Sequence, residues 1–351
     1  MKIVESLFDV CYLMIVVAFG VRLLLEKKNG AKLFGIMAIM LGVGDGFHLI
    51  PRVISHLSPG GFAAHAAALS WGQFVTSITM TIFYVLYYHY YRMQSNDTDN
   101  TKKWLIYGLA IMRIVLVLLP QNNWGTLDGN YMFGIYRNIP FLIMGILLVM
   151  FSYKKKEMHA FKHMWLLILL SFLFYIPVVL FSDKIPAIGA LMMPKTVAYF
   201  LIVWFGFKHF VSEFGVNNMF ANSIMLLIMG LIGGVFYREF TKFYGFTDVT
   251  HLGKIHVHTL VLGFVVSLLL YLLAKDMNDV KLLKKPYAIY LTGFTFTIVN
   301  MVVIGIYEVV REGMDVIVRA AIDGTSGIGH IILGVGIVWM FVKLYNLKIA
   351  E

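Results

Sequence analysis

The sequence has few charged residues and only one cysteine. Charged residues make up 14% of the 351 positions, whereas hydrophobic residues make up 60%. A soluble protein of this length could not cover its surface with so few charges. The lone cysteine, Cys11, excludes an intrachain disulfide, a Cys-ligated zinc site and a Cys-ligated iron–sulfur cluster. The composition therefore predicts an integral membrane protein without any of these centres.

The N-terminus lacks a basic region and a small-residue cleavage site, so we expect the first apolar segment to be retained. Eleven apolar stretches are each long enough to cross a bilayer as a helix, which takes about 20 residues. We expect an all-α, polytopic transmembrane helical bundle of eleven spans. They are residues 7–25, 32–55, 62–92, 104–120, 132–153, 161–182, 187–211, 219–241, 256–275, 286–310 and 324–346.

Lysines and arginines are distributed unevenly between the two sides of this bundle. With the N-terminus outside and the C-terminus inside, 18 of the 29 Lys and Arg residues fall on the inner side and 8 on the outer side. Loops on the cytoplasmic side of membranes are rich in Lys and Arg. We therefore expect this orientation, as a multi-pass protein of the bacterial cytoplasmic (inner) membrane. The net charge of +10 is explained by the basic residues gathered on the inner side of the membrane, and it does not indicate nucleic-acid binding.

A polar break at residues 213–218 separates seven spans from four. We expect two transmembrane modules, a seven-helix module over residues 1–215 and a four-helix module over residues 216–351. The connections are too short for a soluble domain, and no repeat of fixed period is present. The alternative is one continuous eleven-helix body.

Three stretches near the C-terminus resemble a known family. They are residues 234–240 (GVFYREF), 256–263 (HVHTLVLG) and 327–334 (GIGHIILG). From about residue 219 to the end, the chain resembles an uncharacterised four-helix bacterial membrane-protein family, a domain of unknown function. The resemblance implies a four-helix membrane domain and no particular activity. The first 215 residues resemble no family that we recognise.

Histidines gather at the expected outer end of the four-helix module. His256 and His258 begin one span, and His330 lies about two turns into the last span, at a similar depth for a rise of ~1.5 Å per residue. Imidazoles on facing helices can ligate haem iron or a metal ion. We therefore consider a haem b or metal site at His258 and His330. His256 is the weaker candidate, because the rings of a His-x-His pair point to different faces.

Neighbouring residues suit this site and also its alternative, in which the histidines are structural helix-end residues. Three glycines, Gly327, Gly329 and Gly334, would leave a thin face where a macrocycle or another helix could approach. The side chains expected to bind haem propionates or to orient an imidazole are Arg238, Arg311, Arg319, Glu239 and Asp323.

Ionisable residues also lie deep within the expected seven-helix module, where an unpartnered charge is costly. Asp45, His48 and Arg52 are at i, i+3 and i+7 and therefore share one helical face. Asp45 lies ~15 Å and Lys195 ~12 Å below the outer ends of their spans. The matched depth and opposite charge predict that these two side chains approach within salt-bridge distance.

The cations of this module outnumber its acids. Arg113 and Arg137 add to Arg52 and Lys195, and only Asp9 and Asp45 oppose them, which leaves a formal charge of about +2. We expect a pocket for an anionic small molecule or a lipid headgroup. Its candidate residues are Asp45, His48, Arg52, Arg113, Arg137, Lys195, Trp71 and Gln73. The alternative is a set of structural ion pairs, with Arg52 and Arg137 extending outward to the membrane surface.

Two specific chemistries fit the seven-helix module poorly. A lysine in the seventh helix superficially resembles a retinal-binding opsin, but the residues around Lys195 do not match opsin signatures, so we do not expect retinal. A catalytic zinc site needs more than one deep histidine, and His48 is the only one in this module.

The sequence favours a small-ligand-binding or sensory membrane protein. One alternative is a transporter that moves an anionic or proton-coupled solute through the seven-helix pocket. Another is an intramembrane enzyme that modifies lipids, with Asp45 and His48 as its acid–base pair. The sequence alone identifies neither the ligand nor the oligomeric state.

Overall fold

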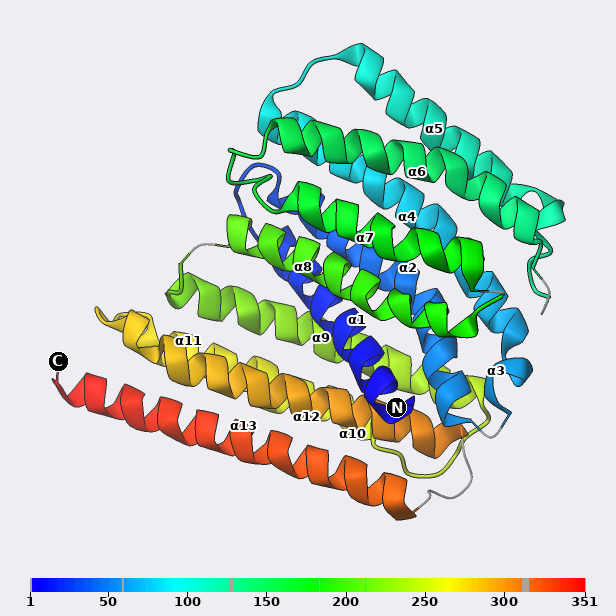
Figure 1. Cartoon of the computed structure of the whole chain (residues 1–351). Coiled ribbons are helices and arrows are strands. Elements are labelled where there is room, and N and C mark those ends of the chain that lie inside the picture. Colours follow the sequence, from blue (N-terminus) through cyan, green and yellow to red (C-terminus); the bar gives the residue numbers. More distant parts are fainter. Residues whose placement is uncertain are drawn as a thin grey trace. The chain divides into compact units, whose positions relative to one another are not determined.

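The computed structural model describes residues 2–58, 60–126, 129–182, 184–211, 213–310 and 316–350. These residues are predominantly helical and contain no β-strand (Figure 1). The α-helices are α1 (Lys2–Leu24), α2 (Ala31–Leu57), α3 (Gly61–Ala64), α4 (Ala66–Ser95), α5 (Asn100–Leu118), α6 (Tyr131–Lys154), α7 (Met164–Phe181), α8 (Met192–Phe210), α9 (Val216–Phe243), α10 (Leu252–His258), α11 (Val266–Ala274), α12 (Lys284–Val310) and α13 (Val316–Ala350). Three short 3₁₀ segments and one π-helical segment complete the set: η1 (Pro120–Asn122), η2 (Pro186–Leu191), η4 (Val280–Leu283) and the π-helical η3 (Thr259–Val265).

The expected all-α architecture is confirmed for the described residues, and every expected span coincides with a helix. Ten helical segments of the described chain are long and apolar enough to cross a membrane, one fewer than expected. The difference is α5, which corresponds to the expected span 104–120. It is helical over 19 residues but carries three cations, Lys102, Lys103 and Arg113, within that length, whereas each of the other ten contains an 18-residue stretch with at most two charged residues.

The chain divides into two compact units. The first, here called the N-terminal unit, contains residues 12–52 and 62–211; the second, the C-terminal unit, contains residues 212–351 together with 1–11 and 53–61. The main division falls near the expected module boundary at 215. The start of α1 and the end of α2 group with the C-terminal unit, so the division is not a single cut in the chain.

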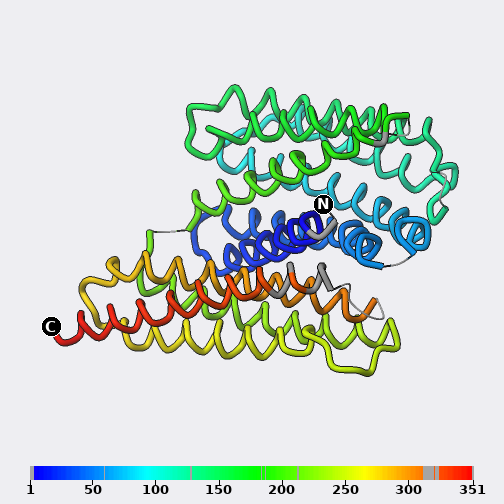
Figure 2. The backbone as a smooth tube through the Cα atoms, turned by 60° about the horizontal axis from the view of Figure 1, so that its bottom comes forward, coloured from blue at the N-terminus to red at the C-terminus, as the bar shows by residue number. Residues whose placement is uncertain are grey.

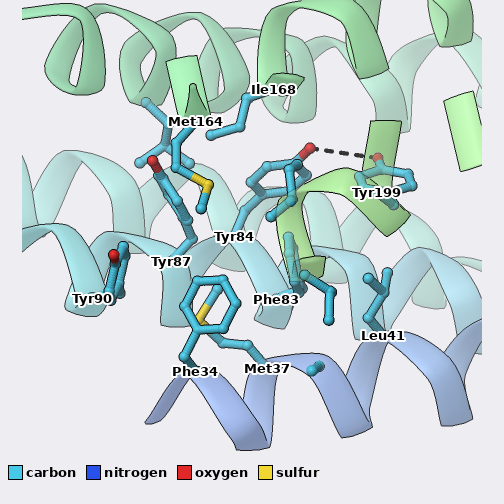
Figure 3. Packing of buried hydrophobic residues seen from close by; sticks show 14 of the residues in the cluster. Phe34, Met37, Leu41, Phe83, Tyr84, Tyr87, Tyr90, Met164, Ile168 and Tyr199 are labelled. Carbon is cyan, nitrogen blue, oxygen red and sulfur yellow. Dashed lines mark hydrogen bonds between the residues drawn. The ribbon is translucent and has the colours of Figure 1, made fainter. Parts of the chain in front are cut away.

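Aromatic side chains from α4 fill the core of the N-terminal unit. Tyr84, Tyr87 and Tyr90 are fully buried and pack against Phe34 of α2 and Met164 of α7 (Figure 3). Each hydroxyl finds a partner, since an unpaired buried hydroxyl is costly. The partners are Ser171 Oγ at 3.1 Å and Tyr199 Oη at 3.4 Å for Tyr84, Ser152 Oγ at 2.8 Å for Tyr87 and the Ala160 carbonyl at 3.4 Å for Tyr90.

Helices α2 and α4 touch through their backbones. A Cβ atom at Gly72 of α4 would overlap the carbonyl oxygen of Phe47 and lie 2.7 Å from the His48 Cα on α2. The Thr76 hydroxyl, one turn further along α4, donates to the Gly44 carbonyl at 3.1 Å. This close approach places the Asp45–Arg52 face of α2 next to the polar residues of α4.

In the C-terminal unit, α12 packs against α13 along its length and also against α10 (Figures 1 and 2). The continuous helix α10–η3–α11 packs against α9. The π-helical segment η3 leaves carbonyl groups without their usual partners. The Tyr290 hydroxyl of α12 donates to two of them, Leu262 and Gly263, and so stabilises the irregular turn.

Candidate functional site

A cavity of about 360 Å³ lies within the N-terminal unit, in the size range of small-molecule sites. Six helices line it, α2 and α4 through α8. Seven of the eight residues proposed from the sequence are in its wall: Asp45, His48, Arg52, Gln73, Arg113, Arg137 and Lys195. The structure therefore brings together residues that are up to 150 positions apart in the chain.

Trp71 is the exception. Its side chain is 52% exposed and is not among the described residues that line the cavity. The indole ring instead packs edge-to-face on Phe74, with 5.6 Å between ring centroids, and lies beside Gly125. Residue 71 is two positions before Gln73, so on a helix the two side chains point in different directions.

Asp45 does not form the expected ion pair with Lys195. Although both line the cavity, the described residues contain no Asp45–Lys195 contact within salt-bridge distance. The Asp45 carboxylate instead accepts a hydrogen bond of 2.6 Å from the Tyr12 hydroxyl on α1. The salt-bridge prediction was therefore wrong, although the two side chains face the same space.

Lys195 is held by aromatic rings. Its Nζ lies 4.8 Å from the ring centroid of Tyr175 on α7 and 5.4 Å from that of Tyr199 on α8. Tyr199 follows Lys195 by one helical turn, which places both on one face of α8. Cation–π contacts stabilise the ammonium but leave its hydrogen-bond donors available.

Arg113 is the most buried cation of the cavity wall. Its side chain is 2% exposed, and its Cζ lies 3.2 Å from the ring centroid of Phe141 on α6. Two of its guanidinium nitrogens, Nε and Nη1, are buried and have no hydrogen-bond partner among the described residues. A buried guanidinium without an acceptor is costly, so Arg113 is the clearest unsatisfied group in the cavity wall.

Arg137 differs from Arg113 because the protein itself supplies its acceptor. Its Nη1 donates to the Asn122 side-chain oxygen at 2.7 Å, and its Cζ lies 4.3 Å from the ring centroid of Trp124. The Asn122 amide in turn donates to carbonyl groups at the end of α5, including that of Leu116 at 2.7 Å. Arg137 therefore closes one side of the cavity as part of a hydrogen-bonded loop.

The cavity wall carries a net positive charge. The described lining residues include four cations, Arg52, Arg113, Arg137 and Lys195, and one acid, Asp45, which gives a formal charge of +3 with His48 neutral. Asp9, expected as a second acid here, is buried but belongs to the C-terminal unit and is not among the described lining residues. The excess of cations is thus larger than the sequence analysis gave.

The sequence analysis missed two residues: Tyr199, which lines the cavity, and Tyr12, which bonds Asp45 from α1. Tyr199 could have been found, because it lies one turn after Lys195 on the same helical face. Tyr12 carried no such signal, since 33 positions separate it from Asp45. Asn138, on α6, accepts a hydrogen bond of 3.0 Å from the Tyr175 hydroxyl on α7 and so fixes the tyrosine that contacts Lys195.

The histidines of the C-terminal unit do not form a ligand set. The Nδ1 atom of His258 donates to the Lys254 carbonyl, and that of His330 donates to the Ser326 carbonyl, each at 2.9 Å within its own helix. His256 lies beside Gly234 of α9. No group of three or more His, Cys, Asp or Glu residues able to hold a metal ion occurs in the described chain, so haem or metal binding is not supported.

The other features expected around these histidines are also not assembled. Gly329 approaches Thr297 on α12, whereas no described atom lies near Gly327 or Gly334, so the glycines do not form one packed face. Arg238 and Glu239 are exposed and form an ion pair with each other, with 3.3 Å between Arg238 Nε and Glu239 Oε1. Arg311 and the side chains of Arg319 and Asp323 lie outside the described residues.

Comparison with known proteins gives one match. Residues 216–347 match the family model described as "protein of unknown function (DUF2871)". The match covers α9 to α13 and supports a domain of unknown function in this part of the chain. No curated protein and no solved structure matches the chain.

Proposed function

We propose that this chain is a multi-pass protein of the bacterial cytoplasmic membrane, with its N-terminus outside and its C-terminus inside. Ten long apolar helices support the multi-pass arrangement. The excess of Lys and Arg in the loops assigned to the inner side supports the orientation. In a Cys11→Ala background, a cysteine at Lys155 should react with an impermeant thiol reagent only after the membrane is opened. Labelling of intact cells would overturn the orientation.

We propose that the N-terminal unit binds an anionic small molecule in its cavity, as a binding or sensory protein. The observation that carries this proposal is Arg113, a guanidinium that is 2% exposed and has two nitrogens without an acceptor. An anion in the cavity would supply the acceptors in charge-assisted hydrogen bonds, for which arginine is well suited.

The remaining charges support the same ligand class. Lys195 offers donors that its aromatic contacts leave available, and Asp45 is occupied by Tyr12 rather than by a cation. The acid therefore does not neutralise Arg113 or Lys195 directly. An anion that neutralises part of the +3 charge would lower the electrostatic cost of burying these cations together.

Calorimetry on the full-length protein in detergent tests this proposal. Phosphate, sulfate and acetate are titrated into wild type, into Arg113→Gln and into the control Arg92→Gln, whose Nε donates to the Asp97 carbonyl outside the cavity. We expect Arg113→Gln to weaken binding by about tenfold or more, the loss typical of a hydrogen bond to a charged group. Wild type that binds no anion, or equal binding by both variants, would overturn the proposal. Flux of the bound anion into proteoliposomes would extend the assignment from binding to transport.

A further inference from the structure

We infer that the ligand is an amphiphile, with an anionic head in the cavity and an alkyl chain in an apolar groove between α6 and α7. This inference rests on the proposed anion site and adds the class of molecule that occupies it. The observation that supports it is that several residues line both the cavity and the groove.

The groove has a volume of about 120 Å³ and an almost wholly apolar lining. Ile139 and Leu142 of α6 and Ile176 and Leu180 of α7 form its sides. Such a lining offers nothing to a hydrated anion, whereas burial of methylene groups there is favourable. The chemistry of the groove therefore suits the chain of an amphiphile and not its head.

Four residues line both spaces: Asn138, Phe141, Tyr175 and Val179. Two of them also contact the cavity cations, because Phe141 lies against Arg113 and Tyr175 lies against Lys195. An anionic head that binds these two cations is thus one aromatic ring away from the groove. The hydrogen bond between Tyr175 and Asn138 joins α7 to α6 at this shared wall.

The surface beside the groove is suited to the entry of a chain from a bilayer. Ile139 is 49% exposed, and Ile143 and Ile146 continue an exposed apolar stripe along α6. Each helix also has a proline within the groove region, Pro140 in α6 and Pro177 in α7. A proline removes one hydrogen bond from the helix, which locally loosens the two elements between which the chain would pass.

The test compares short and long chains on the same head. Binding of butyl phosphate and dodecyl phosphate, and of butyrate and dodecanoate, is measured on the full-length protein held in amphipol. For the head that binds, we expect the twelve-carbon probe to bind wild type at least tenfold more tightly than the four-carbon probe, since a few buried methylenes suffice for that ratio.

A matched pair of variants separates the groove from the cavity. Ile139→Trp fills the groove, whereas Ile146→Trp makes the same change seven residues along the same face, at a residue of similar exposure outside the groove. We expect Ile139→Trp to abolish the preference for the long chain and to leave short-chain affinity unchanged. Ile146→Trp should keep the preference, and Arg113→Gln should weaken both probes.

Each outcome distinguishes the two proposals. Equal affinity of the long and short probes, or a chain preference that Ile139→Trp leaves intact, would overturn the amphiphile inference. If Arg113→Gln still weakened binding in that case, the anion site would stand alone. Wild type that binds none of the four probes would remove both proposals.

Discussion

The two units treat their charged side chains in opposite ways. In the C-terminal unit, charged and titratable groups are matched in pairs at helix ends, as with His56 Nε2 and Glu5 at 2.9 Å and His251 Nδ1 and Glu308 at 2.7 Å. In the N-terminal unit, four cations and one acid line a single cavity, and the acid is bonded to a tyrosine. The two pairs named in the C-terminal unit satisfy each other without a ligand, whereas Arg113 in the N-terminal unit keeps two buried nitrogens without an acceptor among the described residues.

This difference separates structural charges from charges available to a ligand. A buried charge is retained at low cost only when the protein supplies its partner. Arg22 and Arg113 illustrate both cases within the N-terminal unit, because each side chain is 2% exposed. Arg22 Nη1 lies 2.7 Å from Glu26 Oε1, but Arg113 has no acceptor among the described residues. Depth alone therefore does not indicate a site, whereas depth together with an unused donor does.

The largest expected effect concerns this pair of arginines. Arg22→Gln should lower the free energy of unfolding by about 2–3 kcal/mol, because it leaves the carboxylate of Glu26, which is only 14% exposed, without its cation. Arg113→Gln should not lower it, because the substitution removes a buried charge that has no hydrogen-bond acceptor among the described residues. Denaturant unfolding of the purified proteins measures both values.

The double variant Arg22→Gln with Glu26→Gln serves as the control and should recover most of the lost stability. A loss in Arg113→Gln as large as that in Arg22→Gln would indicate that the protein already satisfies Arg113, and the comparison would fail.

A second, smaller effect contrasts the packed interface of one unit with the open wall of the other. A Cβ atom at Gly336 of α13 would lie 2.5 Å from the backbone of Tyr290 on α12, whereas a Cβ at Gly134 in the cavity wall would meet no atom within 4 Å. Gly336→Ala should therefore destabilise the protein by about 1–3 kcal/mol. Gly134→Ala should be neutral or stabilising by up to about 1 kcal/mol, since alanine favours the helix.

Thermal unfolding of both variants in the same detergent checks this contrast. Equal melting temperatures for Gly336→Ala and wild type would show that α13 can move away from α12 at little cost, and the distinction between a closed interface and an open wall would weaken.

Much of the fold could be predicted from the sequence, because apolar runs of membrane length form helices almost wherever they occur. Part of the cavity could be predicted as well. Asp45, His48 and Arg52 share a face by helical spacing, and their depth marks them as unusual. Lys195 and Arg113 were found by the same reasoning about depth.

Two predictions rested on depth in the membrane, which fixes only one of the three coordinates of a side chain: the Asp45–Lys195 ion pair, which was wrong, and the His258–His330 ligand pair, which the structure does not support. Asp45 and Lys195 lie at similar depth, but Tyr12, from a different helix, occupies the carboxylate. His258 and His330 were also matched by depth, yet the Nδ1 atom of each ring bonds a carbonyl of its own helix, that of Lys254 and that of Ser326. The orientation of each helix about its own axis and the choice of neighbouring helices depend on packing between distant segments. Neither can be inferred from the hydrophobic pattern of a single sequence.

The smallest expected effect concerns two ion pairs that each join a loop carboxylate to a lysine in the first turn of a helix. In the N-terminal unit, the Asp97 side chain is 10% exposed and accepts hydrogen bonds from the Lys102 ammonium, the Asp99 backbone N–H and the Tyr91 hydroxyl. Partial burial acts to raise the pKa of Asp97, but these hydrogen bonds and the charge of Lys102 outweigh it, so the pKa lies below its usual value. In the C-terminal unit, Lys281 Nζ lies 3.4 Å from Glu213 Oε2. The Lys281 side chain is 78% exposed and the Glu213 side chain is 89% exposed.

Because the folded-state pKa of Asp97 is lowered, its stabilising contribution is present above the unfolded pKa of about 3.9 and is lost as the pH falls through the folded value. Asp97→Asn should therefore lower the free energy of unfolding by about 1 kcal/mol at pH 7 and have no effect at the acid end of the titration. Glu213→Gln should have no measurable effect at either pH, because an exposed pair is screened by water and salt. Unfolding curves recorded from pH 7 down to the acid limit of the folded protein measure both. If Glu213→Gln cost as much as Asp97→Asn, partial burial would not be what distinguishes the two pairs.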